Sequence, residues 1–240
     1  MEHALILGAS GLVGGHCLKF LLQNDTFGHV TALVRRDIPE NTLSVHPKLT
    51  WLPFDFKDPA AYETLPATDA VFCCLGQPLN RLHRHRELLE VDCHYPLRVA
   101  RRAASTGARH FAIVTSSGIS RYSPLFYCRV KARVERELAE LPFTSLHLFQ
   151  PSLLLGERSD PHPLQAWWGR VLTPAAPWFR GPLGRFRPVA AEAVGFAMVH
   201  TALRPEPGVG RIPSHQIQEL FARHAHETES LRGTSFAREP

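Results

Sequence analysis

The residues of this chain best suited to chemistry are a tyrosine and a lysine four positions apart, in Tyr127-Cys128-Arg129-Val130-Lys131. On a helix this spacing places both side chains on one face. An ammonium beside a phenol lowers the pKa of the tyrosine, which can then exchange a proton with a carbonyl or an alcohol. Ser116 and Ser117 end an apolar segment shortly before, and a hydroxyl there can hold the same substrate oxygen. Of the two serines we favour Ser117.

A second chemical feature is the glycine-rich stretch Gly8-Ala9-Ser10-Gly11-Leu12-Val13-Gly14, between an apolar strand and an amphipathic helix. Gly8 permits a tight turn, Gly11 lets the backbone approach a pyrophosphate, and Gly14 lets helix and strand pack closely. The amino end of the helix presents N–H groups to phosphates. Although the spacing is not that of the common dehydrogenase fingerprint, the position directly after a strand predicts a dinucleotide site.

Residues that follow the next three strands complete this site. Arg35 and Arg36 end the second strand, where paired arginines suit the 2′-phosphate of NADP better than the ribose hydroxyl of NAD. Asp55 follows the third strand and is placed to accept from the adenine amino group. Leu75 and Gly76 follow the fourth, and the glycine lets the backbone pass close to the ribose and nicotinamide. The predicted cofactor is therefore NADP.

The elements that must position these residues alternate between strand and helix. Short apolar runs predict strands buried on both faces of a parallel sheet; they are 4–7, 30–34, 49–52, 70–74, 111–115 and 145–149. Helical patterns cover 11–23, 88–106, 131–141 and 189–203. This alternation predicts an α/β fold with a doubly wound, Rossmann-type parallel sheet.

The character of the chain changes after Pro151. Residues 151–188 are rich in proline and tryptophan, which predicts a C-terminal lid or substrate region over the carboxyl edge of the sheet. We expect a single NAD(P)-binding domain over residues 1–227 and a flexible tail over 228–240.

Composition narrows the class of protein. The net charge of +5 is spread thinly over 240 residues, without the clustered basic and aromatic pattern of a nucleic-acid surface. No apolar run approaches the ~20 residues that span a bilayer, and the N-terminus does not have the pattern of a signal peptide. The cysteines lack zinc spacing. We therefore expect a cytoplasmic protein without a metal, a nucleic-acid partner or a membrane partner.

Together these motifs resemble the short-chain dehydrogenase/reductase superfamily, in its extended or atypical branch. The resemblance is carried by the stretch 8–14, by Ser116-Ser117 and by Tyr127 with Lys131. A closer similarity, over roughly residues 3–205, is to the Tat-interacting-protein oxidoreductase subgroup. It rests on Val30-Thr31-Ala32-Leu33-Val34-Arg35-Arg36, Phe72-Cys73-Cys74-Leu75-Gly76, Val91-Asp92-Cys93-His94-Tyr95, Phe126-Tyr127-Cys128-Arg129-Val130-Lys131 and Pro151-Ser152-Leu153-Leu154-Leu155.

The resemblance implies a Rossmann-type fold that binds NADPH, with Tyr127 as the proton donor and Lys131 as its partner and a ligand of the nicotinamide ribose. The remaining implied contacts are Ser10, Gly11, Leu12 and Val13 for the pyrophosphate, Arg35 and Arg36 for the 2′-phosphate, Leu75 and Gly76 for the ribose, and Leu154 over the nicotinamide. Many family members carry an asparagine in the fourth helix that supports a proton relay. Here Asp92 is the nearest polar candidate.

The function expected from these features is hydride transfer between NADPH and a small-molecule carbonyl or alcohol substrate. Two alternatives remain open. One is a non-catalytic regulator that binds NADPH and a protein partner. The other is a sugar-nucleotide epimerase or dehydratase, for which the part after Pro151 leaves limited room.

Overall fold

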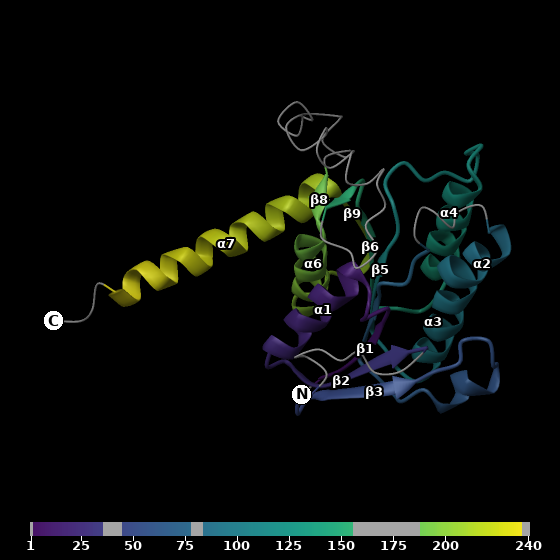
Figure 1. Ribbon diagram of the computed structural model, residues 1–240, viewed down its shortest axis with the longest axis horizontal. Helices are drawn as coiled ribbons and strands as arrows, with labels where there is room; N and C mark the ends of the chain where they lie inside the picture. Colours follow the sequence, from purple (N-terminus) through teal and green to yellow (C-terminus); the bar gives the residue numbers. More distant parts are fainter. Residues whose placement is uncertain (1, 36–44, 78–83, 156–187, 237–240) are drawn as a thin grey trace.

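Seven strands form one parallel sheet in the order β3-β2-β1-β4-β5-β6-β9 (Figure 1). They are β1 (Glu2–Leu7), β2 (Phe27–Val34), β3 (Leu49–Pro53), β4 (Ala70–Cys73), β5 (His110–Val114), β6 (Ser145–Gln150) and β9 (Gly208–Pro213). A short pair, β7 (Leu154–Leu155) and β8 (Val189–Ala190), lies beside the sheet. This computed structural model describes residues 2–35, 45–77, 84–155 and 188–236, and it does not describe the side chains of 226–236. The predicted doubly wound, Rossmann-type fold is confirmed.

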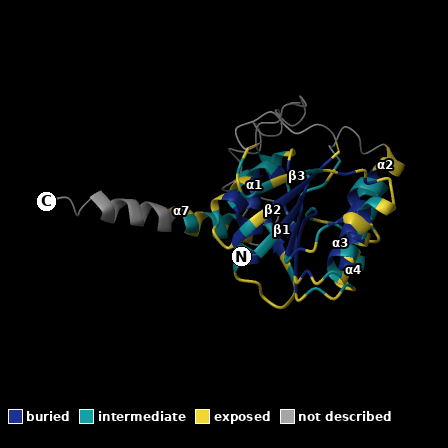
Figure 2. Ribbon diagram, turned by 90° about the horizontal axis from the view of Figure 1, so that it is seen from below, coloured by how far each residue is buried: buried dark blue, intermediate teal, exposed yellow. Residues whose placement is uncertain are grey.

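Helices cover both faces of the sheet (Figures 1 and 2). On one face lie α1 (Leu12–Gln23) and α6 (Ala191–Leu203); on the other lie α2 (His85–Leu89), the π-helical turn η3 (Glu90–His94), α3 (Tyr95–Ser105) and α4 (Phe126–Ala139). Side chains alternate along each strand, so Ala4 and Ile6 enter the core beneath α1 while Leu5 and Leu7 enter the opposite one. Burial on both faces explains why the strands read as continuous apolar runs.

The topology determines where a ligand can bind. From β1 the chain moves outward through β2 to β3, then returns to β4 and moves outward the other way. In such sheets the ligand crevice lies at the carboxyl ends of the strands, where the strand order reverses. The glycine-rich turn follows β1 and therefore lies at that point.

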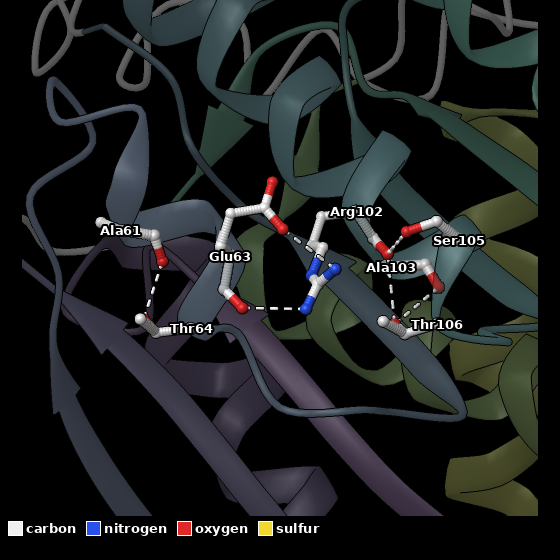
Figure 3. Close-up of polar contacts among 7 residues, drawn as sticks. All are labelled: Ala61, Glu63, Thr64, Arg102, Ala103, Ser105 and Thr106. Atoms are coloured by element: carbon white, nitrogen blue, oxygen red, sulfur yellow. Dashed lines mark hydrogen bonds and ion pairs between the residues drawn. The ribbon is translucent and has the colours of Figure 1, made fainter.

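Helix α3 is tied to the short 3-10 helix η1 (Ala60–Thr64) by one arginine (Figure 3). The guanidinium of Arg102 lies 3.2 Å from the Glu63 carboxylate and donates to the Glu63 carbonyl at 2.8 Å. At the end of the helix, Ser105 and Thr106 donate their hydroxyls to the Arg102 carbonyl at 2.8 and 3.1 Å. The two contacts of Arg102 with Glu63 hold α3 against the segment that follows β3, and the two hydroxyl bonds close the end of α3.

The predicted start of the helix that carries Lys131 is wrong. Helix α4 begins at Phe126 rather than at residue 131, directly after the extended residue Leu125. Pro124 disfavours helix in the residue before it but not in those after it. Tyr127 therefore lies in the first turn of α4, one turn before Lys131, as the spacing argument requires.

Two C-terminal elements were not predicted. Strand β9 is an edge strand with Gly208 and Gly210 and several exposed positions, so its apolar pattern is weak. Helix α7 (Ser214–Phe236) follows it, and most of its length extends away from the sheet (Figure 1). Its helical backbone runs through much of the segment 228–240 that we expected to be a flexible tail. Most of the expected lid, residues 156–187, and the predicted ligand Arg36 lie outside the described residues.

Replacing Gly14 with alanine should destabilise the fold. A Cβ at Gly14 would lie 2.0 Å from the Gly8 carbonyl oxygen, which is backbone and cannot rotate away. We expect a loss of at least about 2 kcal/mol in the free energy of unfolding, measured by urea denaturation. Gly15→Ala is the matched control, because its Cβ would lie 3.7 Å from the Ala9 carbonyl oxygen. Equal stability of the two variants would contradict this packing argument.

Candidate functional site

The glycine-rich turn brings three segments together at the carboxyl end of β1. Gly8 has a φ of +78°, and a Cβ there would lie 2.8 Å from the Cys74 carbonyl oxygen. Gly14 in turn packs α1 directly onto Gly8. Only glycine at both positions allows β1, α1 and the segment after β4 to approach so closely.

The amino end of α1 is suited to an anion. Its N-cap residue is Gly11, which has no side chain to occupy the terminal N–H groups, and the first turn of α1 holds no acidic residue. The helix dipole and these N–H groups favour a phosphate. The arrangement fits a cofactor pyrophosphate at Ser10, Gly11, Leu12 and Val13.

A cavity of about 1320 Å³ opens beside this turn, along the ends of β2, β3 and β4. It brings together four residues predicted from the sequence. They are Arg35, Asp55, Leu75 and Gly76. Helices α2 and α3 supply the facing wall. The size and polar lining of the cavity fit the adenosine half of a dinucleotide.

The residues predicted to transfer a proton centre on a buried ion pair. The Lys131 ammonium lies 2.8 Å from the Asp92 carboxylate, with side-chain exposures of 3% and 1%. The other oxygen of Asp92 accepts the backbone N–H of Gln77 at 2.9 Å. Lys131 also donates to the Val114 carbonyl at 3.4 Å. The pair therefore joins α4, the π-helical turn η3, the end of β5 and the segment after β4.

This ion pair determines the charge at the site. Burial acts to lower the pKa of Lys131, but the charges of Asp92, Tyr127 and Cys73 outweigh it and raise that pKa well above its ordinary value. Lys131 is thus an ammonium throughout the physiological range of pH.

Tyr127 lies beside Lys131, with the ammonium 5.9 Å from the centre of the ring. Burial raises the pKa of Tyr127, Lys131 lowers it, and Asp92 raises it again, so that the net direction is upward. The sequence led us to expect a lowered pKa. The difference arises because burial of the phenol, the largest effect, together with the Asp92 carboxylate outweighs the lysine charge. The phenol is therefore protonated at neutral pH.

The two candidate serines lie in different environments. The Ser116 hydroxyl donates to the Ser117 carbonyl at 3.4 Å, and its interaction with the Tyr127 phenol favours the phenolate and acts to lower the pKa of Tyr127. The backbone N–H of Ser117 donates to the Pro151 carbonyl at 2.9 Å. The geometry therefore favours Ser116 as the partner of Tyr127, although the sequence led us to favour Ser117.

Sequence reasoning missed Glu135, a buried carboxylate one turn after Lys131 on α4. It accepts the Thr115 hydroxyl at 2.6 Å and the Gln150 amide at 2.9 Å, and so links the ends of β5 and β6. Its place four positions after Lys131 was the available signal. Glu135 fixes the segment that carries Ser116. Leu154, the residue predicted to cover the nicotinamide, lies in β7 and packs against the core cluster that contains Val13.

A family model described as NAD(P)H-binding matches residues 8–140. This range contains the glycine-rich turn, the cavity and the Tyr127–Lys131 pair. The chain belongs to the NAD(P)H-binding family. A nicotinamide cofactor is therefore the ligand that the family match supports.

Relatives in the atypical short-chain dehydrogenase/reductase subgroup cover most of the chain. Protein HTATIP2 of Rattus norvegicus is 31% identical over 75% of this chain and 74% of the relative. Protein FMP52, mitochondrial, of Eremothecium gossypii is 31% identical over 88% of this chain and 92% of the relative. The resemblance drawn from the motifs is confirmed.

Solved structures share the fold at low identity. The Bordetella bronchiseptica enzyme WbmH in complex with NAD+ superposes with a TM-score of 0.68 at 16% identity, covering 92% of this chain and 79% of the other. A UDP-glucose 4-epimerase from Thermotoga maritima gives a TM-score of 0.66 at 15% identity, with coverages of 92% and 80%. At these identities the likeness establishes the fold alone.

The expectation of a cytoplasmic protein is contradicted by the relatives. Several of them, from Eremothecium and Aspergillus, are mitochondrial by name. In the described residues no helix combines the length and apolar character needed to cross a membrane. Within the same residues no group of three or more potential ligands could hold a metal ion.

The Lys131–Asp92 pair should couple strongly in a double-mutant cycle. Asp92→Asn leaves a buried ammonium without its counter-charge, and Lys131→Met leaves a buried carboxylate; each should lower the free energy of unfolding by about 3–5 kcal/mol. The double variant should lose much less than the sum of the two, as measured by urea denaturation of all four proteins. Strictly additive losses would show that the two charges do not interact.

Proposed function

We propose that this protein is an NADPH-dependent oxidoreductase of the short-chain dehydrogenase/reductase type, which reduces a small-molecule carbonyl to an alcohol. The observation that carries the proposal is the set Ser116, Tyr127 and Lys131 with the buried counter-ion Asp92. Proton transfer to a carbonyl requires a hydroxyl donor beside a positive charge, whereas binding of the cofactor alone requires neither the phenol nor the serine. The cofactor, when bound, supplies the hydride.

Each side chain has a distinct part in the proposed reaction. The Tyr127 phenol, protonated at neutral pH, donates its proton to the carbonyl oxygen as that oxygen gains charge. The Ser116 hydroxyl donates a hydrogen bond to the same oxygen. The Lys131 ammonium stabilises the phenolate that remains and reaches the nicotinamide ribose.

The same proposal assigns the binding contacts. Ser10, Gly11, Leu12 and Val13 hold the pyrophosphate at the amino end of α1. Asp55 accepts from the adenine amino group, Leu75 and Gly76 line the ribose, and Leu154 covers the nicotinamide. Arg35 holds the 2′-phosphate together with Arg36, which makes NADP the preferred cofactor.

NADPH should bind more tightly than NADH, and Arg35→Ala should remove most of that preference. A charge-assisted hydrogen bond to the 2′-phosphate contributes about 1.5–3 kcal/mol, so NADPH affinity should fall by at least about tenfold while NADH affinity changes little. Isothermal titration calorimetry with both cofactors measures this. Arg109→Ala is the control, since this exposed arginine, 3.9 Å from Glu2, precedes β5 at the opposite edge of the sheet. Equal affinity of the unmodified protein for the two cofactors would overturn the preference for NADP.

Tyr127→Phe should abolish turnover and spare cofactor binding, because the ring still packs and only the proton-donating hydroxyl is lost. General acid catalysis contributes ~10²–10⁴-fold to a rate. A panel of aldehydes and ketones, followed by NADPH absorbance, identifies a substrate on which the variant is compared with Tyr122→Phe. Tyr122 is the matched control, a 78%-exposed tyrosine on the preceding loop. If Tyr127→Phe retained its activity, Tyr127 would not be the general acid. If the unmodified protein bound NADPH tightly but turned over no compound of the panel, the alternative of a non-catalytic regulator would replace the proposed enzyme.

A further inference from the structure

The cavity beside the glycine-rich turn carries more positive charge than the predicted cofactor contacts explain. Its described lining includes five cationic side chains and three carboxylates. The cations are Arg35, Lys57, Arg84, Arg86 and Arg98, and the carboxylates are Asp55, Glu87 and Glu90. Of the cations, sequence reasoning assigned only Arg35 to the cofactor.

Arg98 differs from the neighbouring arginines of α3. Arg101 lies 3.1 Å from Glu137, and Arg102 lies 3.2 Å from Glu63. Within the described part of the chain, Arg98 has no carboxylate at ion-pair distance; its guanidinium instead lies over the ring of Tyr62, 5.8 Å from the ring centre. Arg98 is half-buried. A half-buried cation without an anionic partner is a site at which an anionic ligand gains binding energy.

Tyr95 lines the same cavity as Arg98 and Arg35. It is buried and stacks on Phe56 with ring centres 5.3 Å apart. Burial and Glu90 raise the pKa of Tyr95, whereas the charges of Arg98 and Arg35 both lower it. Both guanidiniums therefore act on one phenol oxygen, Arg35 from the end of β2 and Arg98 from α3. The cavity therefore holds two cations, from the end of β2 and from α3, whose charges reach the same side chain.

We propose that Arg98 is a second ligand of the cofactor's 2′-phosphate, facing Arg35 across the cavity, and a determinant of the preference for NADPH. The inference rests on the proposed NADPH binding and deepens it. A phosphate monoester carries up to two negative charges and three acceptor oxygens, so it can accept N–H donors from two guanidiniums at once. The side chain of Tyr62 supports the Arg98 guanidinium by a cation–π contact and accepts a hydrogen bond from it; a guanidinium has five N–H donors, more than one tyrosine oxygen can accept.

The test compares ligands that differ in the 2′-phosphate. Arg98→Met keeps the apolar contact with Tyr62 and removes the charge, and Arg98→Lys keeps the charge. Arg101→Met is the matched control, on the same helix but paired with Glu137. The affinities of NADPH, NADH, adenosine 2′-monophosphate and adenosine 5′-monophosphate are measured by calorimetry, with circular dichroism as the check of folding.

We expect Arg98→Met to lower the affinity for NADPH and for adenosine 2′-monophosphate by about tenfold. Its affinities for NADH and adenosine 5′-monophosphate should stay unchanged. Arg98→Lys should restore part of the loss, and Arg101→Met should behave as the unmodified protein. An equal loss for NADPH and NADH, or no loss for either, would overturn the role of Arg98 while leaving cofactor binding intact. Failure of the unmodified protein to bind either cofactor would instead overturn the proposed function, and this inference with it.

Discussion

The buried ion pair between Lys131 and Asp92 is the interaction on which the rest of the site depends. Two charges removed from water are stable only if each compensates the other and their remaining donors and acceptors are satisfied. Here the Gln77 N–H and the Val114 carbonyl complete that arrangement. The four partners come from four different segments, so the pair ties α4 to the π-helical turn η3, to the end of β5 and to the segment after β4.

The same pair sets the chemistry available to Tyr127. A lone ammonium would stabilise the phenolate, but an ammonium already paired with a carboxylate exerts a weaker field. Burial then dominates, and the phenol holds its proton at neutral pH. This protonation state suits the donation of a proton to a carbonyl oxygen. The π-helical turn at Glu90–His94 contributes, since it carries the residue that holds the lysine.

The backbone forms one side of the crevice and charged side chains form the other. On the sheet side, glycines at positions 8 and 14 bring the backbone of three segments into contact and expose the amino end of α1, which suits the invariant part of any dinucleotide. On the helix side, α2 and α3 present charged side chains to the cavity at the ends of β2, β3 and β4. The sheet geometry thus suits the part that NAD and NADP have in common. The charges on the facing helices are where a preference for one of these two cofactors can arise.

The sequence by itself determined the sheet, the order of strand and helix, and the glycine-rich turn, because these depend on local patterns: apolar runs, glycine spacing and the i,i+4 separation of Tyr127 and Lys131. It also placed Arg35, Asp55, Leu75 and Gly76 in one crevice, since each follows a strand and parallel strands end at one edge. It missed β9, whose glycines weaken the pattern, and the start of α4. Only the tertiary structure decided that Asp92 meets Lys131, that Ser116 acts on the pKa of Tyr127, and that Arg98 lines the crevice without a carboxylate partner among the described residues. The pairing of charges from distant helices is set by three-dimensional packing, and nothing in the linear spacing of those residues encodes it.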